Sequence, residues 1–290
     1  MRVALTGATG FGGTEVLAEF SRRAYETTAL LRAPIPADGV AVIAGDLSNL
    51  GAFAGAVEAS DAVVHLACSR SSAENDVTAD VEGTAGLLAH WKSGSFVLVS
   101  SGALQRGIES GYALGKLAGE FALHLAASAG RRGPAICLRP GIFLGGGARR
   151  NDRQTLGRVF AAAREGATFV FSSEAGLETF GSSFIGTADF ARAICAALTL
   201  KQRGDFNVAG GFCTWRELIE TVNRCAGTQA QLAVRPGPPN APGEVALSQS
   251  RCELDTTTFD TTTGFVPKQS LEMLVEEYLR AEGELEAKPC

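Results

Sequence analysis

The sequence lacks the residue patterns that mark metal sites, nucleic-acid interfaces and membrane spans. Its 7 cysteines are scattered singly without a C-x-x-C pair, and its 3 histidines form no H-E-x-x-H run, so we expect neither a zinc site nor a disulfide framework. A formal net charge of -5 leaves no basic face for nucleic acid. No apolar run approaches the length that crosses a bilayer. We therefore expect no metal, no nucleic-acid partner and no membrane segment.

Two further shortages are informative. No apolar leader with a cleavage site precedes the first strand-like run, "RVALTG", which predicts a cytoplasmic protein with reduced thiols. Tyrosine is scarce, with 3 among 290 residues, so the position of each tyrosine is informative.

Hydrophobic residues, by contrast, make up 46% of the chain. That content is enough for a large core, as one domain or as a domain with a smaller companion.

Short apolar runs alternate with segments of helical spacing through the first half of the chain. We predict buried strands at 2–7, 27–32, 40–46, 62–67, 95–101 and 135–141, and helices at 13–23, 50–58, 81–92 and 112–128. Repeated strand, helix and strand units imply right-handed crossovers and a parallel sheet covered on both faces. The predicted fold class is α/β, with a doubly wound Rossmann sheet.

The character of the sequence changes after about residue 145, where a loop rich in glycine and arginine begins. We expect a dinucleotide-binding domain over residues 1–145, to which later segments near 180–210 return, and a smaller lobe, mainly substrate-binding, over 146–290. In the loop, Arg149, Arg150 and Arg153 could meet an anionic substrate, although a solvated loop explains them more simply. The proline-rich "RPGPPNAPGE" is interpreted as a surface loop.

The strongest local signal is "TGATGFGG", between the first strand and the first helix. Gly7, Gly10 and Gly13 have G-x-x-G-x-x-G spacing, which allows a tight turn, close approach of the backbone to a pyrophosphate and close packing of helix on strand. The N-terminus of the helix would then face the phosphates. The triphosphatase loop G-x-x-x-x-G-K-[ST] is a near miss, because Gly13 stands where that motif needs lysine. We predict a dinucleotide site.

One of the scarce tyrosines is followed 4 positions later by a lysine, in "YALGK". Tyr112 and Lys116 would share one face of a helix. A free phenol has a pKa of about 10 and would need a fall of roughly 3 units to act as a base near neutrality. A cation about 5 Å away supplies most of that fall only in a water-poor cleft. The alternative is a packed tyrosine ring beside a lysine that extends to solvent.

A strand that ends in serines strengthens the catalytic interpretation of this pair. "FVLVSSGAL" ends at Ser100 and Ser101, which would place a hydroxyl at the carboxyl edge of the sheet, where ligands of such sheets bind. We therefore predict Ser101, Tyr112 and Lys116 as the catalytic residues.

These motifs together resemble the extended short-chain dehydrogenase/reductase family, which includes nucleotide-sugar epimerases and ketone reductases. The resemblance covers essentially the whole chain and includes "VVHLA", in which His65 is interpreted as a packed strand residue beside the cofactor. It implies that Tyr112 exchanges a proton with the substrate oxygen, that Ser101 hydrogen-bonds this oxygen and that Lys116 holds the cofactor ribose. The implied cofactor-binding residues are Gly7, Thr9, Gly10, Phe11, Gly13, Arg32, Asp46, Leu47, Leu66, Ala67, Lys116, Pro140, Gly141 and Ile142.

The end of the second strand, "TTALLRAP", bears on the choice of cofactor. Enzymes that prefer NAD place an acidic residue near this point, whereas an arginine suits the 2′-phosphate of NADP. Arg32 therefore predicts a preference for NADP, with NAD as the less favoured cofactor.

Several positions depart from the family pattern. Asp80 stands where the family commonly has asparagine. Gly102 and Ala103 replace the Asp-Glu pair of sugar dehydratases, and Ser182 stands where nucleotide-sugar enzymes tend to carry an arginine. These differences favour an NAD(P)-dependent oxidoreductase acting on a small or medium-sized ketone or alcohol. A nucleotide-sugar epimerase and a non-catalytic NADP-binding sensor remain alternatives.

Small residues are concentrated on the predicted helix that carries Tyr112. Gly115, Ala118 and Gly119 would allow close contact with a helix of a second subunit, or equally close packing on the sheet. A homodimer is therefore a possible assembly, with a small-molecule substrate as the other expected partner.

Overall fold

The computed structural model describes residues 1–32, 39–69, 73–108, 110–130, 133–145, 155–281 and 283. They form two compact units. The first contains Met1–Pro140, Phe190–Val208 and Thr256–Phe265, and the second contains Gly141–Asp189, Ala209–Asp255 and Val266–Cys290. Arg149, Arg150 and Arg153 lie outside the described residues. Within these residues, no helix combines the length and the apolar character that a bilayer span requires.

The first unit is built on a seven-stranded sheet with the order β10-β6-β5-β4-β1-β2-β3, and its strand pairings are parallel. The strands are β1 (Arg2–Thr6), β2 (Glu26–Leu31), β3 (Val40–Ala44), β4 (Ala62–His65), β5 (Ser95–Val99), β6 (Ala135–Pro140) and β10 (Gly204–Val208). The central strands β1, β4 and β5 are buried along nearly their whole length, as expected for strands covered on both faces. The α/β fold with a doubly wound parallel sheet is confirmed.

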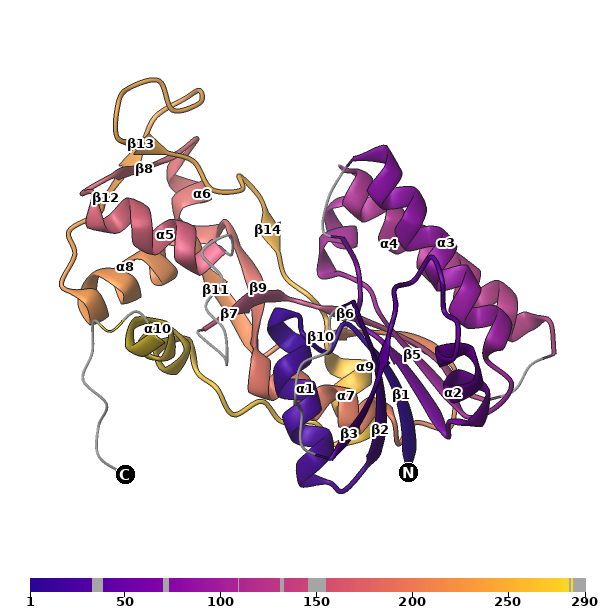
Figure 1. Cartoon of the computed structure of the whole chain (residues 1–290). Helices are drawn as coiled ribbons and strands as arrows, with labels where there is room; N and C mark the ends of the chain where they lie inside the picture. The colour runs from indigo at the N-terminus through magenta and orange to yellow at the C-terminus, as the bar shows by residue number, and fades with distance from the viewer. Residues whose placement is uncertain are drawn as a thin grey trace. The chain divides into compact units, whose positions relative to one another are not determined.

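Helices cover both faces of this sheet (Figure 1). They are α1 (Phe11–Arg22), α2 (Phe53–Ala59), α3 (Glu74–His90), α4 (Gly111–Ser128), α7 (Thr187–Ala197) and α9 (Thr257–Thr263), with a short 3-10 helix η1 (Gly102–Arg106). On one face α2, α3 and α4 share a core with the strands, in which Trp91 meets Phe96 edge-on at 5.5 Å between ring centroids. On the other face lies α9, where Phe259 packs on Phe206 of β10 at 5.9 Å.

The strand order reverses between β1 and β4. The chain runs outward through β2 and β3 on one side of β1, and through β5, β6 and β10 on the other side of β4. In sheets of this kind the loops that follow the two central strands diverge and leave a crevice at their carboxyl ends. The glycine turn follows β1 and Leu66 follows β4, so both segments lie at this point.

The second unit has two smaller sheets. One has the order β11-β9-β14 with β7 also paired to β9, and the other has the order β12-β8-β13. The strands are β7 (Ile142–Leu144), β8 (Thr168–Phe171), β9 (Gly181–Gly186), β11 (Gly211–Thr214), β12 (Gln231–Val234), β13 (Glu244–Val245) and β14 (Arg251–Cys252), and the helices are α5 (Thr155–Arg164), α6 (Glu174–Thr179), α8 (Trp215–Ala226) and α10 (Leu271–Ala281). Phe160 of α5 packs edge-on against Tyr278 of α10 in the core of this unit.

Candidate active site

The turn after β1 and the start of α1 are packed so closely that one position in each requires glycine. Gly7 has φ +77°, and a Cβ there would lie 2.6 Å from the backbone nitrogen of Ala67. A Cβ at Gly13 would lie 2.0 Å from the carbonyl oxygen of Gly7. The Gly10 N–H donates to the same oxygen at 3.0 Å. The turn therefore packs against both the start of α1 and the segment after β4.

The N-terminus of helix α1 lacks the side-chain cap and the acidic residues that often stabilise the start of a helix. Its N-cap is Gly10, which provides no side-chain cap, and its first turn, opened by Phe11, holds no acidic residue. No acidic side chain within the first turn offsets the partial positive charge of this N-terminus, which suits an anionic group. Together with Thr9 in the turn, these residues fit the pyrophosphate of a dinucleotide.

Arg32, Asp46 and Leu47 lie at the ends of the next two strands. Arg32 directly follows β2 and is exposed. Asp46 follows β3 and accepts hydrogen bonds from the Ser48 hydroxyl and from the Ser48 and Asn49 N–H groups. These bonds, the Ser48 hydroxyl first, and the nearby charge of Arg32 hold the pKa of the Asp46 carboxyl below its ordinary value. Leu47 packs against α3, since a Cβ at Gly83 would lie 2.5 Å from its Cβ.

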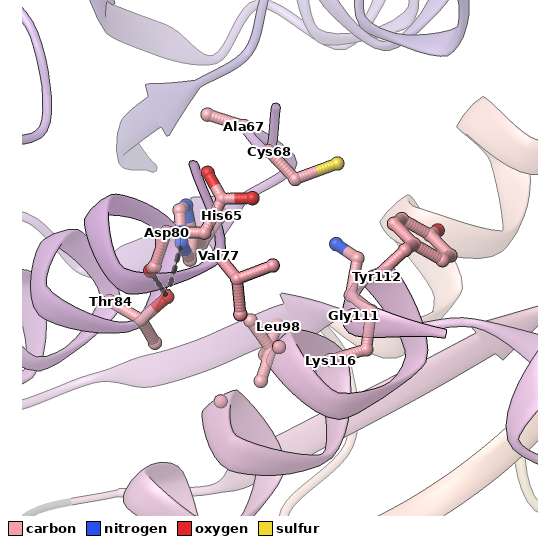
Figure 2. Close-up of a pocket in the computed structure, with 12 residues that line it drawn as sticks. His65, Ala67, Cys68, Val77, Asp80, Thr84, Leu98, Gly111, Tyr112 and Lys116 are labelled. Carbon is pink, nitrogen blue, oxygen red and sulfur yellow. Dashed lines mark hydrogen bonds between the residues drawn. The ribbon is translucent and has the colours of Figure 1, made fainter. Parts of the chain in front are cut away.

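A pocket lies in the first unit between α3, α4 and the segment after β4 (Figure 2). Of the predicted catalytic residues, Tyr112 and Lys116 line it, and Ala67 of the predicted cofactor contacts joins them. Its full lining is His65, Ala67, Cys68, Val77, Asp80, Thr84, Leu98, Gly111, Tyr112, Gly115, Lys116 and Gly119.

The lysine of the Tyr–Lys pair is fixed by the strand next to it. Lys116 Nζ donates to the Val99 carbonyl oxygen at 2.8 Å and lies 5.8 Å from the centroid of the Tyr112 ring. An ammonium group has three protons, so this bond leaves two for other acceptors. The arrangement holds a cation beside a half-buried phenol at the carboxyl end of β5.

The two serines at the end of β5 have different surroundings. Ser101 Oγ accepts a hydrogen bond from the Ala103 N–H at 3.1 Å and caps η1, which leaves its hydroxyl proton available to donate. Ser100 is 3% exposed, and its Oγ has no hydrogen-bond partner among the described residues. Ser101 is thus the serine whose hydroxyl is oriented by a turn.

Asp80 is a functional candidate that the sequence marked only as a departure from the family pattern. Its carboxylate accepts hydrogen bonds from the Ser69 N–H at 2.9 and 3.0 Å and from the Ser69 hydroxyl at 2.9 Å. An asparagine has one side-chain oxygen and could not accept all of these bonds in the same way. Asp80 therefore ties α3 to the segment after β4, in the wall of the pocket. No sequence pattern around Ser69 signalled this contact.

A charge network fixes α4 to the edge of the sheet. Glu120 is 2% exposed and accepts from Arg139 Nε at 2.8 Å, and this bond first of all raises the pKa of the Arg139 guanidinium. Arg139 also pairs with Asp205 of β10, which bonds His124 of α4 at 2.7 Å. Cys137 brings a third potential metal ligand close to His124 and Asp205, but the carboxylate is already engaged by His124 and Arg139.

Other residues singled out in the sequence are not among those that line this pocket. Leu66 follows β4, and its N–H donates to the Thr6 carbonyl oxygen at 3.2 Å. Pro140 ends β6, whereas Gly141 and Ile142 belong to the second unit. Ser182 is buried in β9 of that unit, where its hydroxyl donates to the Ser183 carbonyl oxygen.

Comparison with known proteins identifies the family. The model of the NAD dependent epimerase/dehydratase family matches residues 3–209. The chain belongs to this family. The match extends from β1, which precedes the glycine turn, to the end of the seventh strand of the sheet.

The proteins to which this chain is similar carry different names, and those with solved structures hold different bound molecules. A ceramide reductase from Caulobacter vibrioides is 28% identical over 250 residues, which cover 81% of this chain and 74% of the relative. MoeE5, solved with UDP-glucuronic acid and NAD, has a TM-score of 0.77 at 19% identity, covering 98% of this chain and 99% of its own. UDP-glucose 4-epimerase from Thermus thermophilus, solved with NAD, has a TM-score of 0.71 at 23% identity, covering 96% and 99%. These structural likenesses show the fold.

Proposed function

We propose that this family member is an NAD(P)-dependent oxidoreductase that transfers a hydride between the nicotinamide and a hydrophobic ketone or alcohol. The observation that carries the proposal is the Tyr112–Lys116 pair, which lines one pocket with its ammonium anchored on Val99. A protein that only senses a dinucleotide has no need of a phenol and an ammonium group placed together in a pocket.

The chemistry assigns a separate task to each residue. A bound nicotinamide would supply the hydride that the carbonyl carbon gains. Tyr112 donates its phenolic proton to the carbonyl oxygen and later regains a proton from solvent. Lys116 would donate a hydrogen bond to a hydroxyl of the cofactor ribose, and Ser101 would donate a hydrogen bond to the substrate oxygen. In the direction of alcohol oxidation every transfer is reversed.

Several residues favour an uncharged, apolar substrate over a nucleotide sugar. A sugar diphosphate brings negative charges that must meet arginines or oriented N–H groups. At the position where nucleotide-sugar enzymes tend to carry an arginine, this chain has the buried Ser182. Gly102 and Ala103 replace the dehydratase pair. The likeness to a ceramide reductase also favours an apolar, lipid-like substrate.

The decisive experiment is an assay of ketones of increasing chain length with NADPH and NADH, read by loss of the absorbance of the reduced nicotinamide. We expect turnover that improves with apolar chain length. The epimerase alternative is tested with UDP- and GDP-sugars. Calorimetry measures whether they bind, and mass-resolved chromatography shows whether they are converted. Tight binding of a sugar nucleotide together with an epimerised product would replace this proposal by the epimerase alternative.

The cofactor preference is a further part of the proposal. Arg32 stands exposed at the end of β2, where its guanidinium can pair with a 2′-phosphate. We expect NADPH to bind more tightly than NADH in fluorescence titrations, and Arg32→Ser to lower NADPH affinity by about tenfold with little change for NADH. Tighter binding of NADH by the wild-type protein would contradict this preference.

A further inference from the structure

His65 connects three parts of the first unit through both of its ring nitrogens. It ends β4 and is 2% exposed. Its Nδ1 lies 2.6 Å from Thr6 Oγ1 at the end of β1, and its Nε2 lies 3.0 Å from Thr84 Oγ1 on α3. Figure 2 shows the imidazole beside Thr84 and Asp80 in the wall of the pocket.

The neighbouring hydrogen bonds determine which nitrogen carries the proton. Thr84 donates its hydroxyl proton to the Asp80 carbonyl oxygen at 2.8 Å. A hydroxyl has a single proton, so Thr84 must accept from His65 Nε2–H. Nδ1 then has a free lone pair and accepts from the Thr6 hydroxyl. The Thr6 oxygen in turn accepts from the Ala67 N–H at 3.3 Å.

The ring can keep this arrangement only while it is neutral. Burial, and then the charge of the Lys116 ammonium, lowers the pKa of His65 to about 3. The charged groups that share the pocket with the ring are Lys116 from α4 and Asp80 from α3. A proton on Nδ1 would oppose the hydroxyl proton of Thr6 and disrupt the hydrogen-bond chain at the end of β1.

The position of this chain relates it to the glycine turn. Thr6 is followed directly by Gly7, where a Cβ would lie 2.6 Å from the Ala67 nitrogen. The turn and the segment after β4 are thus in contact, and a displacement of Thr6 would move the backbone against which a pyrophosphate packs. At the other end, Thr84 is bonded to Asp80, whose carboxylate holds Ser69.

We propose that His65 is a positioning residue, which as the neutral Nε2–H tautomer holds the glycine turn at a fixed spacing from α3 and thereby sets the affinity for the dinucleotide. The proposal rests on the family's dinucleotide binding at this turn, and it does not depend on the identity of the substrate. The Thr6 hydroxyl and the ring act in one chain, so the loss of either should have the same effect.

The test uses isosteric changes in the full-length protein. Thr6→Val keeps the shape but removes the hydroxyl, and Thr6→Ser keeps the hydroxyl. We expect the dissociation constant for NADPH or NADH to rise at least about tenfold in Thr6→Val, which leaves a buried ring nitrogen unpaired, and less than about threefold in Thr6→Ser. His65→Gln should resemble Thr6→Val, and the double variant should be no weaker than either single one. His90→Gln, on a partly exposed histidine paired with Glu58, is the matched control.

A spectroscopic measurement tests the proposal without any variant binding data. The chain has 3 histidines, and nitrogen-15 spectra assign the His65 ring by loss of its signals in His65→Asn. We expect a proton on Nε2 and no titration between pH 5 and 8. A proton on Nδ1, a titration in this range, or a folded Thr6→Val protein with unchanged cofactor affinity would overturn the proposal. Wild-type protein that binds cofactor but reduces no ketone would count only against the proposed reaction, whereas failure to bind either cofactor would overturn both.

Discussion

The proposed reaction depends on the phenolic oxygen of Tyr112. Tyr112→Phe removes the proton donor with little change in volume, so we expect turnover to fall by about 100-fold or more while the cofactor dissociation constant stays within about twofold. Lys116→Ala should weaken both, since Lys116 serves both the phenol and the ribose. Steady-state kinetics on the best ketone, with a parallel cofactor titration, separate the two effects. Near-normal turnover by the Phe variant would refute the assigned proton transfer.

His65 also makes folding stability depend on pH. Its pKa is lowered to about 3 in the folded protein, whereas an unfolded histidine has a pKa of about 6.5. The unfolded chain therefore binds a proton that the folded chain does not, and stability falls as the pH is lowered through this window. Between pH 7 and pH 5 the contribution amounts to about 2 kcal/mol in the free energy of unfolding.

Urea denaturation of the wild type and of His65→Asn at both pH values isolates this contribution, because His90 and His124 remain in both proteins. The variant should lose less stability on acidification than the wild type. Equal losses in the two proteins would show that His65 is not buried in the neutral form.

Among single residues, the sequence predicted those features that depend on spacing along the chain. The glycine turn and the Tyr112–Lys116 pair follow from local geometry, and the structure places the pair in one pocket. The bonds of His65 were not predictable, because Thr6 lies 59 positions away and Thr84 lies 19 positions away. Contacts of that kind depend on which strands become neighbours.

Helix α1 packs closely on the turn that follows β1 because residue 13 is a glycine. Gly13→Ala would press a methyl group into the Gly7 carbonyl, where the Cβ has only 2.0 Å, so α1 must shift away from the turn. We expect dinucleotide affinity to fall by at least about tenfold and stability by about 1–3 kcal/mol. Gly55→Ala is the matched control, because it lies within α2 and its Cβ would meet nothing within 4 Å. Calorimetric titration and thermal unfolding of both variants give the comparison.

The elements themselves were largely predictable, with two instructive differences. Helix α3 begins at Glu74, whereas the apolar spacing predicted a start at residue 81. Its first turn carries Glu74 and Asp76, which stabilise a helix N-terminus by their charge rather than by apolar contacts. Strand β10 completes the sheet from a distant part of the chain, and its Phe206 packs against Phe259 of α9, for which the sequence analysis predicted no helix. The burial of such a side chain depends on contacts with distant segments, which the periodicity of its own segment does not reveal.

The outer face of α4 bears on the assembly of the whole molecule. Leu114, Leu117, Phe121 and Leu125 are 49%, 38%, 68% and 60% exposed, and their spacing forms one apolar stripe along the helix. Stripes of this kind mark protein interfaces. Gly115 and Gly119 face the pocket and not this stripe, so the expectation depends on the exposed apolar side chains. We expect this stripe to pack against its own copy in a homodimer.

Phe121→Glu tests this assembly, because it would place two charges in the apolar contact of a dimer. Sedimentation velocity should show a dimer for the wild type and a monomer for the variant, with the fold retained by circular dichroism. Val266→Glu, at a position 67% exposed in the second unit, should remain dimeric. A monomeric wild type at micromolar concentration would argue against the interface.

The return of α9 to the first unit has a consequence for the order of events during synthesis. Strand β10 and the helix that packs on it come from residues 190–208 and 256–265. A nascent chain that has emerged only as far as residue 145 would therefore carry six of the seven strands, with the hydrogen-bonding edge of β6 unpaired. Such an edge can pair with other chains. The sheet gains β10, the edge strand beside β6, only late in translation, and a fragment cut near residue 145 should aggregate in cells unless a chaperone shields it.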